Sequence, residues 1–270
     1  EFSMRSLIPL LVAAFLAAPS AFAQVQGDPE VIALLMEDAG LKAPLQRLSL
    51  ITAELQDGVM KTRMQPIGRL FQKYPRIARD LARLLGKAVE LVLVGEDTEI
   101  DKTMIEDLSD PIIHLIRNAV DHGVEDRAGR LAAGKPEKSN VRLEARQEGD
   151  HIVLIVADDG RGMSPERIRA KAIEKGLIKE EEANTLDDRQ SLNLIFLPGF
   201  STMTQASAVS GRGVGMDVVK TEVGSLGGRI ETVSTPGQGT EFLLYIPLTL
   251  AVTTALIVRA GSKRYSIPSV

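Results

Sequence analysis

The sequence predicts an α/β domain preceded by one or two helices. Apolar segments with strand-like alternation recur from residue 88 onward, and segments with helical spacing lie between them. Hydrophobic residues make up 44% of the 270 residues and charged residues 25%, which is the balance of a globular protein. This length predicts one or two domains and is enough to bury a core.

Composition excludes several classes of function. The chain has no cysteine, which excludes disulfide scaffolds, cysteine zinc sites, iron–sulfur clusters and thiol nucleophiles. Its net charge of -4 argues against broad electrostatic binding of nucleic acid. With 4% aromatic residues and no tryptophan, the chain is also a poor base-stacking platform.

Residues 1–26 differ from the rest of the chain. The first three residues precede Met4 and are typical of a cloning scar. The basic start, the apolar run over 7–18 and the Ala-Phe-Ala triplet at 21–23 are typical of a secretory signal peptide. A non-native fusion is the alternative, and this segment is set aside in predicting the fold.

Two helical segments precede the strands. Residues 30–40 have an amphipathic pattern that ends at Gly40. Over 45–64 the apolar residues follow one helical stripe, and Pro66 is predicted to end the helix. Because a lone amphipathic helix cannot bury its stripe, this helix packs either on the body of the protein or in a dimerisation bundle.

The body alternates between helices and strands. The spacing predicts helices over 75–85, from Asp110-Pro111 through Asp121, over 165–175 and over 214–226. Strands are predicted over 88–94, 141–147, 151–157, 229–234, 240–246, 254–258 and 264–267. Turn residues at 148–150 and 235–239 predict two hairpins. The polar stretch 178–212, rich in glycine, serine and threonine at its end, is predicted to be a long loop or lid.

A helix carries the first candidate site. His114, Asn118, Asp121 and His122 lie at i, i+4, i+7 and i+8, so their side chains share one helix face, and the opposite face is apolar. Such a face fits a wet site in which Asn and His ligate a divalent ion and His acts as a base. The alternative is a solvated helix face whose terminal His is favoured by the helix dipole.

The second candidate is the segment Asp158-Asp159-Gly160-Arg161-Gly162, which directly follows an apolar strand. A carboxylate at a strand end can accept a hydrogen bond from an exocyclic amine, and the two glycines let a ligand ring approach the backbone. An Asp-Gly turn without any ligand is the common alternative.

The third and fourth candidates are glycine-rich. Residues 211–216 (GRGVGM) open a helix, so free amides, the helix N-terminus and Arg212 together favour phosphate, with a flexible hinge as the alternative. The sequence has neither the dinucleotide fingerprint nor a Walker motif. Gly237-Gln238-Gly239-Thr240 is by itself only a hairpin turn, and it gains meaning from following the other three segments.

The order of these four segments resembles the ATP-binding fold shared by histidine kinases, type II topoisomerases, Hsp90 and MutL. Within that fold, HLIRNAVDHGVE, DDGRGM, PGFSTM and SGRGVGMDVV are similar to chemotaxis sensor histidine kinases of the CheA type. So are the upstream stretches DGVMKTRMQPIGRLFQKYPRIARDLARLLGK and GEDTEIDKTMIEDLSDP. The resemblance covers roughly residues 45–270 and implies a two-layer α+β sandwich, with a mixed sheet, helices on one face and an ATP lid.

The resemblance also implies ATP and Mg²⁺ as cofactors. Asn118 would hold Mg²⁺ with His122 close by, and Asp158 would accept from the adenine amine. His114 stands where topoisomerases and Hsp90 carry a water-activating Glu, which fits phosphoryl transfer to a protein. Further nucleotide contacts are implied for Asp121, Gly160, Gly162, Arg167, Lys171, Ser201, Arg212, Gly213, Val214, Gly215, Met216 and Thr240. The lid segment would contain Phe196, Phe200, Ser201 and Thr202.

The implied activity is that of a protein-histidine kinase. It would transfer the γ-phosphoryl group of ATP to a histidine on a separate phosphotransfer domain, because neither the site histidines nor His151 suits the role of acceptor. An ATP-hydrolysing switch and a non-catalytic assembly module are the alternatives. The full-length family implies response regulators, a coupling protein and chemoreceptors as partners, and a homodimer.

The resemblance divides the chain into four parts. These are a signal-like segment at 1–26, a helical region at 27–66 with one recognisable dimerisation helix, a catalytic domain at 67–248 and the truncated start of a regulatory domain at 249–270. Receptor control is expected to be lost with the truncated domain. A cytoplasmic location is expected because the site needs ATP, in conflict with the signal-like N-terminus.

Overall fold

The computed structural model describes residues 61–200 and 215–248 in full, the backbone of 255–260 and 263–268, and single residues between 47 and 59. It divides into two units, Glu1–Val59 and Met60–Val270. The described residues of the first unit are helical, and four apolar ones are exposed: Leu50, Ile51, Leu55 and Val59. The signal-like segment and the helix predicted over 30–40 lie outside the described residues.

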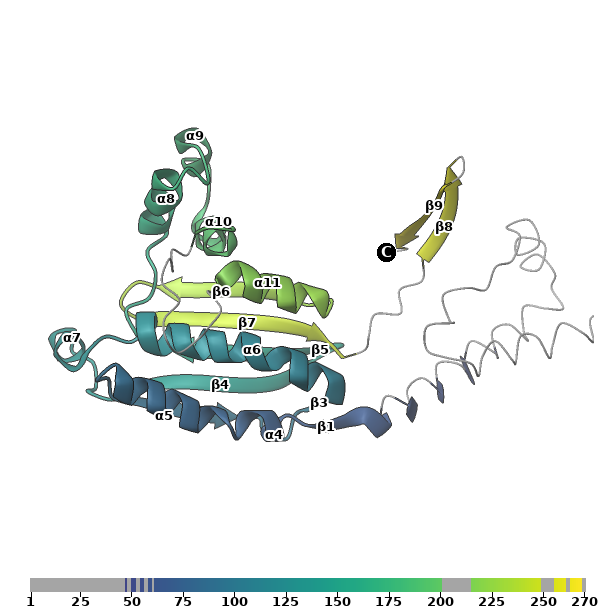
Figure 1. Cartoon of the computed structure of the whole chain (residues 1–270), viewed down its shortest axis with the longest axis horizontal. Helices are drawn as coiled ribbons and strands as arrows, with labels where there is room; N and C mark the ends of the chain where they lie inside the picture. The colour runs from purple at the N-terminus through teal and green to yellow at the C-terminus, as the bar shows by residue number, and fades with distance from the viewer. Residues whose placement is uncertain are drawn as a thin grey trace, which may run out of the picture. The chain divides into compact units, whose positions relative to one another are not determined.

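A five-stranded mixed sheet is the centre of the second unit (Figure 1). Its strands are β2 (Val89–Val94), β4 (Ser139–Glu148), β5 (His151–Asp158), β7 (Gly239–Pro247) and β6 (Arg229–Thr235), in that spatial order. β2 runs parallel to β4, and every other neighbouring pair is antiparallel. The predicted mixed sheet is confirmed.

Helices α5 (Tyr74–Leu84), α6 (Lys102–Asn118) and α11 (Met216–Ser225) cover one face of this sheet (Figure 1). The main core lies between them, where Leu108 and Leu115 of α6 pack with Leu143, Leu154 and Leu244 from the central strands. This arrangement confirms the predicted two-layer sandwich. It also places the C-terminal end of α6 over the ends of β5 and β7.

The other face of the sheet carries a smaller apolar cluster. Val153 and Ile155 of β5 are buried there, with Leu243 and Tyr245 of β7 directly opposite them. Charged side chains flank the cluster through ion pairs such as Arg142–Glu241 (3.0 Å) and Arg146–Glu148 (2.6 Å). The guanidinium carbon of Arg229 lies 3.9 Å from the ring centroid of Tyr245. Long charged side chains therefore shield this face from water.

The remaining elements are short. They are β1 (Met64–Pro66), α4 (Gly68–Phe71), β3 (Glu99–Asp101), the π-helical turn Ala119–Gly123, α7 (Arg127–Ala132), α8 (Pro165–Glu174), α9 (Glu180–Ala183), α10 (Asp188–Asn193), the 3-10 turn Leu194–Phe196, β8 (Ala255–Ala260) and β9 (Lys263–Pro268). β1 pairs with β3, and β8 pairs with β9. No helix among the described residues is long and apolar enough to cross a membrane.

Most predicted element boundaries agree with the structure to within two residues, and three differences have a physical reason. The helix predicted to open at Asp110-Pro111 begins at Lys102, because Asp101 caps it by accepting hydrogen bonds from the backbone N–H and hydroxyl of Thr103 at 2.8 and 2.7 Å. Pro111 is buried inside α6. The helix predicted to run to Met64 instead ends at Arg63, because Met64 begins strand β1.

The stretch 178–212 is the third correction. It is not a continuous loop, since α9, α10 and the turn Leu194–Phe196 lie within it. A capping box starts α10: the backbone N–H of Gln190 donates to the Asp187 carboxylate at 2.6 Å, and the Gln190 side chain accepts from the Asp187 N–H at 2.9 Å. Residues 201–214 of the predicted lid lie outside the described part.

Candidate nucleotide site

The C-terminal end of α6 forms the first wall of the site. α6 ends at Asn118, and Ala119–Gly123 continue as one π-helical turn, a form that is frequent at functional sites. Lys87 holds this turn, because its Nζ donates to the carbonyl oxygens of Val120 (2.9 Å), Asp121 (2.5 Å) and Val124 (2.9 Å). The turn is thereby fixed from behind by a cation that satisfies carbonyls at the helix end.

His114 lies on α6 with its imidazole largely buried. Burial lowers the pKa of His114 to about 4, and the positive charge of Arg117 acts in the same direction, against the raising effect of Asp217. The ring is therefore neutral at pH 7. A neutral imidazole in a partly dry site has one free nitrogen that can accept a proton.

Asn118 connects α6 to the start of α11. Its amide donates to the sulfur of Met216 at 3.0 Å, and Met216 is the first residue of α11. Gly215 is the N-cap residue of that helix. His122 is exposed and lies 3.8 Å from the Asp121 carboxylate. Of the predicted polar residues, Asn118 thus contacts the helix that follows the glycine-rich segment.

Asp158 is the last residue of β5, and the strand register places it opposite Thr240 of β7. Its carboxyl group is 9% exposed, and its Oδ1 accepts from the N–H of Gly160 at 2.9 Å. Burial raises the pKa of Asp158 to about 6, and the negative charges of Asp159 and Glu125 add to this effect. A buried carboxylate with unused acceptor capacity is suited to an amine donor.

Glycines surround the Asp158 side chain. A Cβ at Gly123 would lie 2.8 Å from the carboxyl carbon of Asp158, and a Cβ at Gly160 would lie 2.1 Å from the carbonyl oxygen of Gly123. Gly239 has a φ of 125°, and a Cβ there would lie 1.9 Å from the carbonyl oxygen of Asp158. These positions admit only glycine at the observed backbone separation. The Asp158 carboxyl therefore lies in a cradle of glycine backbone, with no side chain from these three positions beside it.

The structure brings part of the predicted set together. Asp158, Gly160 and Thr240 meet at the ends of β5 and β7, and Gly123 joins them to the turn that carries Asp121 and His122. Gly162 has a φ of 65°, and a Cβ there would lie 2.1 Å from the carbonyl oxygen of Thr235. Four predicted residues fall instead within 201–214, which lies outside the described part of the chain: Ser201, Arg212, Gly213 and Val214.

Arg167 and Lys171 lie on α8, and their predicted nucleotide contacts stay a prediction. The backbone N–H of Arg167 donates to the Ser164 hydroxyl at 3.2 Å as part of the helix cap. The Lys171 ammonium lies 5.3 Å from the centroid of the Phe200 ring, which is buried with the ring of Phe196 in the main core. In this structure the charge of Lys171 therefore faces an aromatic ring.

Sequence reasoning missed several residues that build the site. Gly123 has no role among the sequence predictions, although its packing against Asp158 sets the shape of the cradle. Lys87, Arg130 and Lys135 carried no motif at all, because their roles depend on contacts with distant segments. The sequence signals beside them are two glycines that mark turns, Gly86 before Lys87 and Gly134 before Lys135.

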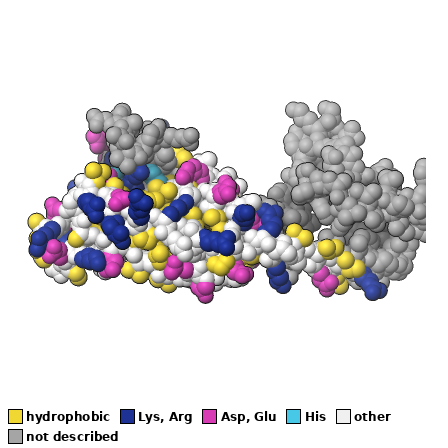
Figure 2. Space-filling model, turned by 60° about the horizontal axis from the view of Figure 1, so that its bottom comes forward, with side chains coloured by type: hydrophobic (Ala, Val, Ile, Leu, Met, Phe, Trp, Pro, Cys, Tyr) yellow, Lys and Arg dark blue, Asp and Glu magenta, His cyan; other side chains and the backbone are white. Residues whose placement is uncertain are grey.

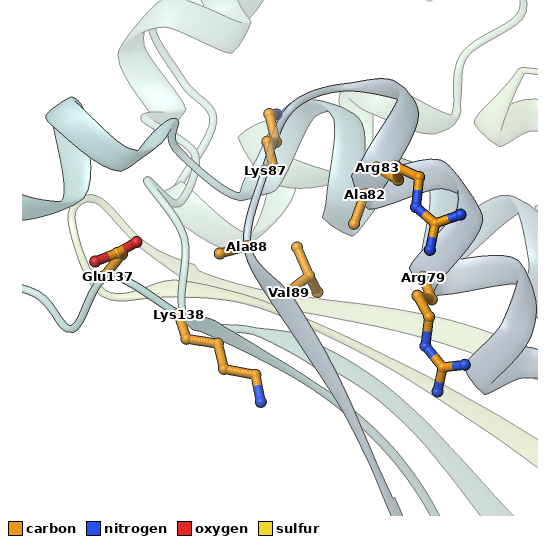
Figure 3. A pocket seen from close by; sticks show the side chains of 8 residues that line it. All are labelled: Arg79, Ala82, Arg83, Lys87, Ala88, Val89, Glu137 and Lys138. Carbon is orange, nitrogen blue, oxygen red and sulfur yellow. The ribbon is translucent and has the colours of Figure 1, made fainter.

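A separate groove of about 500 Å³ lies between α5 and the start of β2 (Figure 3). Basic side chains from both sides line it, over a small apolar floor: Arg79, Ala82, Arg83, Lys87, Ala88, Val89, Glu137 and Lys138. None of the predicted nucleotide residues is among them. Lys138 is paired with Glu90 at 2.8 Å. Figure 2 shows basic side chains with acidic ones between them across the face that comes forward.

The described residues offer no metal site built from protein ligands alone. No group of three or more histidine or carboxylate side chains that could hold a metal ion occurs among the described residues. Asn118 supplies an amide oxygen, which is a hard donor of the kind Mg²⁺ accepts when phosphate oxygens and waters complete its shell. The residues present thus fit a cation that arrives with a nucleotide better than a resident metal.

Comparison with known proteins agrees with this geometry. The family model described as histidine kinase-, DNA gyrase B-, and HSP90-like ATPase matches residues 107–250. The chain is 51% identical over 228 residues to the sensor histidine kinase CheAY of Helicobacter pylori, covering 84% of this chain and 28% of that protein. It is 43% identical over 243 residues to the chemotaxis protein CheA of Bacillus subtilis, covering 90% and 36%. The chain thus spans about a third of the length of these relatives.

Solved structures give weaker likenesses. The histidine kinase domain of a blue-light activated kinase from Erythrobacter litoralis matches with a TM-score of 0.40 at 19% identity, covering 68% of this chain and 61% of that one. The catalytic domain of histidine kinase ThkA matches with a TM-score of 0.42 at 16% identity, covering 69% and 95%. The family match extends over the site helix, the Asp158 turn and the β6–β7 hairpin. The chain therefore belongs to the family of histidine kinase-, DNA gyrase B- and HSP90-like ATPases.

Proposed function

We propose that this chain is the ATP-binding catalytic portion of a chemotaxis histidine kinase. It transfers the γ-phosphoryl group of ATP to a histidine on a separate phosphotransfer domain. The observation that carries this proposal is the buried carboxyl of Asp158, enclosed by Gly123, Gly160 and Gly239. The identity of 43–51% to chemotaxis kinases over most of the chain supports the kinase assignment.

Asp158 selects the base. Its carboxylate accepts a hydrogen bond from the exocyclic amine of adenine, and guanine offers a carbonyl oxygen at the same ring position, which a carboxylate repels. The glycine cradle excludes water from this contact, so a mismatched base would leave a buried charge unpaired. Adenine nucleotides are therefore favoured over guanine nucleotides.

Asn118 is the residue best placed to hold Mg²⁺ together with the phosphates. Its side-chain oxygen stands at the end of α6, beside the N-terminus of α11, where backbone amides favour anions. His122 is exposed and paired with Asp121, which makes it a secondary candidate. The cation, when bound, neutralises charge on the transferring phosphoryl group.

His114 holds a free acceptor nitrogen near the phosphate end of the site. Its lowered pKa keeps it neutral, so it can orient the incoming histidine or take a proton from it. It does not carry the negative charge with which a glutamate activates water. This chemistry supports transfer to a protein over hydrolysis, and positioning supplies most of the rate enhancement.

Titration with nucleotide tests the proposal. Calorimetry with ATP, ADP and GTP, each with and without Mg²⁺, should give binding of both adenine nucleotides and none of GTP. Addition of the purified phosphotransfer domain of a related chemotaxis kinase with labelled ATP should then label that domain. Absence of ATP binding would refute the proposal and favour an assembly module, and steady phosphate release without the domain would favour an ATPase switch.

The wider setting follows from the same assignment. A kinase of this class acts with response regulators, a coupling protein and chemoreceptors, and it works as a homodimer in the cytoplasm, where ATP is available. The domain division at 27–66, 67–248 and 249–270 belongs to this proposal. The labelling experiment in the presence and absence of the coupling protein and receptor fragments tests the regulatory part.

A further inference from the structure

We infer that Arg130 and Lys135 are positioning residues for the carboxyl group of Asp158, and that they act through the turn at Asp159 and Gly160. The inference rests on the proposed function, because it concerns the group that recognises adenine. Neither residue belongs to a recognised nucleotide motif. Both lie between the π-helical turn and β4 in the sequence, and both contact the turn at Asp159 and Gly160 directly.

Arg130 binds Asp159, the residue that follows Asp158. Its side chain is 1% exposed, and its two terminal nitrogens donate to the two carboxylate oxygens of Asp159, each at 3.0 Å. Nη1 also lies 3.3 Å from the carbonyl oxygen of Asp159. A guanidinium that binds both the side chain and the backbone of one residue fixes its position and direction.

Lys135 binds backbone carbonyl oxygens of the same turn. Its Nζ donates to the carbonyl oxygens of Asp159 (2.9 Å) and Gly160 (2.6 Å) and to the carboxylate of Glu125 (2.8 Å). The peptide that links residues 159 and 160 carries the N–H of Gly160, which donates to Oδ1 of Asp158. Lys135 thus holds one end of the same peptide whose other end orients the Asp158 carboxyl.

The cluster also balances charge beside Asp158. Two cations, Arg130 and Lys135, face two carboxylates, Asp159 and Glu125. Burial acts to raise the pKa of both carboxyls, but hydrogen bonds from Ser139 and Arg130 on Asp159, and from Lys135 on Glu125, lower them below the usual range. Both groups are therefore ionised at neutral pH.

These two negative charges are the charged neighbours that raise the pKa of Asp158 after burial itself. The two cations offset them. If one cation is removed, the negative charge of Asp159 or Glu125 is less well neutralised. The pKa of Asp158 then rises, so its carboxyl group stays protonated up to a higher pH. A protonated Asp158 is a weaker acceptor for an amine. If Arg130 and Lys135 only stabilised the fold, replacing them would lower the stability of the protein and leave the pKa of Asp158 unchanged.

The test compares Lys135→Met with Lys138→Met. Both replacements keep an apolar stem, but Lys138 pairs with Glu90 on the edge strand and makes no contact with the turn. ADP affinity measured calorimetrically between pH 5.5 and 8.5 should fall about ten-fold at pH 7 for Lys135→Met and not for Lys138→Met. In Lys135→Met, the loss of ADP affinity at low pH should set in at a higher pH than in the wild type. Protonation of ADP itself affects both proteins equally and therefore cancels in the comparison.

A second measurement keeps the inference falsifiable. The pKa of Asp158, followed by carboxyl-carbon NMR in the free protein, should rise in Lys135→Met and in Arg130→Met, each of which removes one of the two cations. If Arg130→Met does not fold, Lys135→Met decides alone. An unchanged Asp158 pKa and unchanged ADP affinity in a folded Lys135→Met would overturn the inference. A wild type that binds no ADP would instead refute the proposed function, and the NMR titration would still decide the inference.

Discussion

Gly123 packs against the carboxyl group of Asp158, so closely that a Cβ at residue 123 would lie 2.8 Å from the Asp158 carboxyl carbon. This contact joins the end of the site helix to the end of β5. The N–H of Arg161 donates to the carbonyl oxygen of Gly123 at 2.9 Å and reinforces the same junction. The separation of these two backbones therefore sets the width of the cradle.

Gly123→Ala should close that cradle. The added methyl group must displace the Asp158 carboxyl, so we expect ATP affinity to fall at least ten-fold while the protein remains folded. Gly224→Ala in α11 is the matched control, because a Cβ there meets no atom within 4 Å. Equal ATP affinities for the two variants in calorimetric titrations would contradict the expectation.

Asp158→Asn should stabilise the free protein at neutral pH. The pKa of Asp158 is raised from 3.8 to about 6, so the folded state binds the proton more tightly than the unfolded state, and the stability associated with it is lost as pH rises through this range. The asparagine carries no charge to bury, and the gain at pH 7.5 should be about 3 kcal/mol at most.

Urea unfolding at several pH values measures this effect. The wild type should lose more stability than Asp158→Asn between pH 4 and pH 6.5. Parallel pH profiles for the two proteins would mean that the carboxyl is not held in a desolvated position. If Asp158→Asn is more stable but no longer prefers adenine nucleotides, the buried carboxylate lowers stability in the wild type in return for selectivity.

His114→Gln should leave nucleotide binding intact and slow phosphoryl transfer to an added phosphotransfer domain. The imidazole is already neutral in the folded protein, so glutamine preserves polarity and removes the basic nitrogen. Single-turnover transfer with saturating ATP should fall by 10²-fold or more. Parallel losses of binding and transfer would mark His114 as a structural residue.

The same histidine predicts an acid-sensitive fold. Its folded-state pKa lies below its unfolded value, so the stability it contributes is present above about pH 6.5 and is lost as pH falls toward 4. In His114→Gln this part of the acid transition should be absent. Thermal unfolding at pH 4.5 and pH 7.5 measures the difference, and an identical pH dependence in both proteins would argue against a buried neutral imidazole.

Asp101→Ala should destabilise the protein without changing ATP affinity. Asp101 is almost fully buried, caps α6 through Thr103, and accepts from Arg63 at 3.2 Å. Loss of a helix cap typically costs about 1 kcal/mol, and the unpaired Arg63 adds to this. A lower urea midpoint with an unchanged ATP dissociation constant is expected, whereas weaker ATP binding would tie the start of α6 to the site.

Local patterns in the sequence predicted most of the sheet, because the strands of an amphipathic layer alternate visibly. β7 agrees with the prediction to within a residue for this reason. β5 is buried on both faces and agrees equally well because it stands out as a continuous apolar run. The start of α6 was not found, since a proline usually marks the first turn of a helix and Pro111 instead lies in its interior. The true start of α6 is marked by the cap at Asp101, and this cap can be recognised only once the packing around Asp101 is known.

The positions of several candidate site residues in the fold were predictable, and their roles in binding stay predictions. Asn118, Asp158 and Thr240 stand at the ends of the elements on which the sequence placed them. The supporting residues were not predictable, because Lys87 and Arg130 act on carbonyl oxygens and a carboxylate that are distant in sequence. Such contacts follow from tertiary packing and leave no periodicity or spacing behind.

The helix-free face of the sheet has a consequence of its own. Its arginines and glutamates bind each other along β4 and across β5, as in the pairs Arg146–Glu148 and Arg142–Glu241, over a thin apolar layer. A protein that approaches this side therefore meets charges that are already paired with each other. The exposed valines Val92, Val94 and Val233 lie on the edge strands β2 and β6, so contact with exposed apolar side chains is confined to the two edges of the sheet.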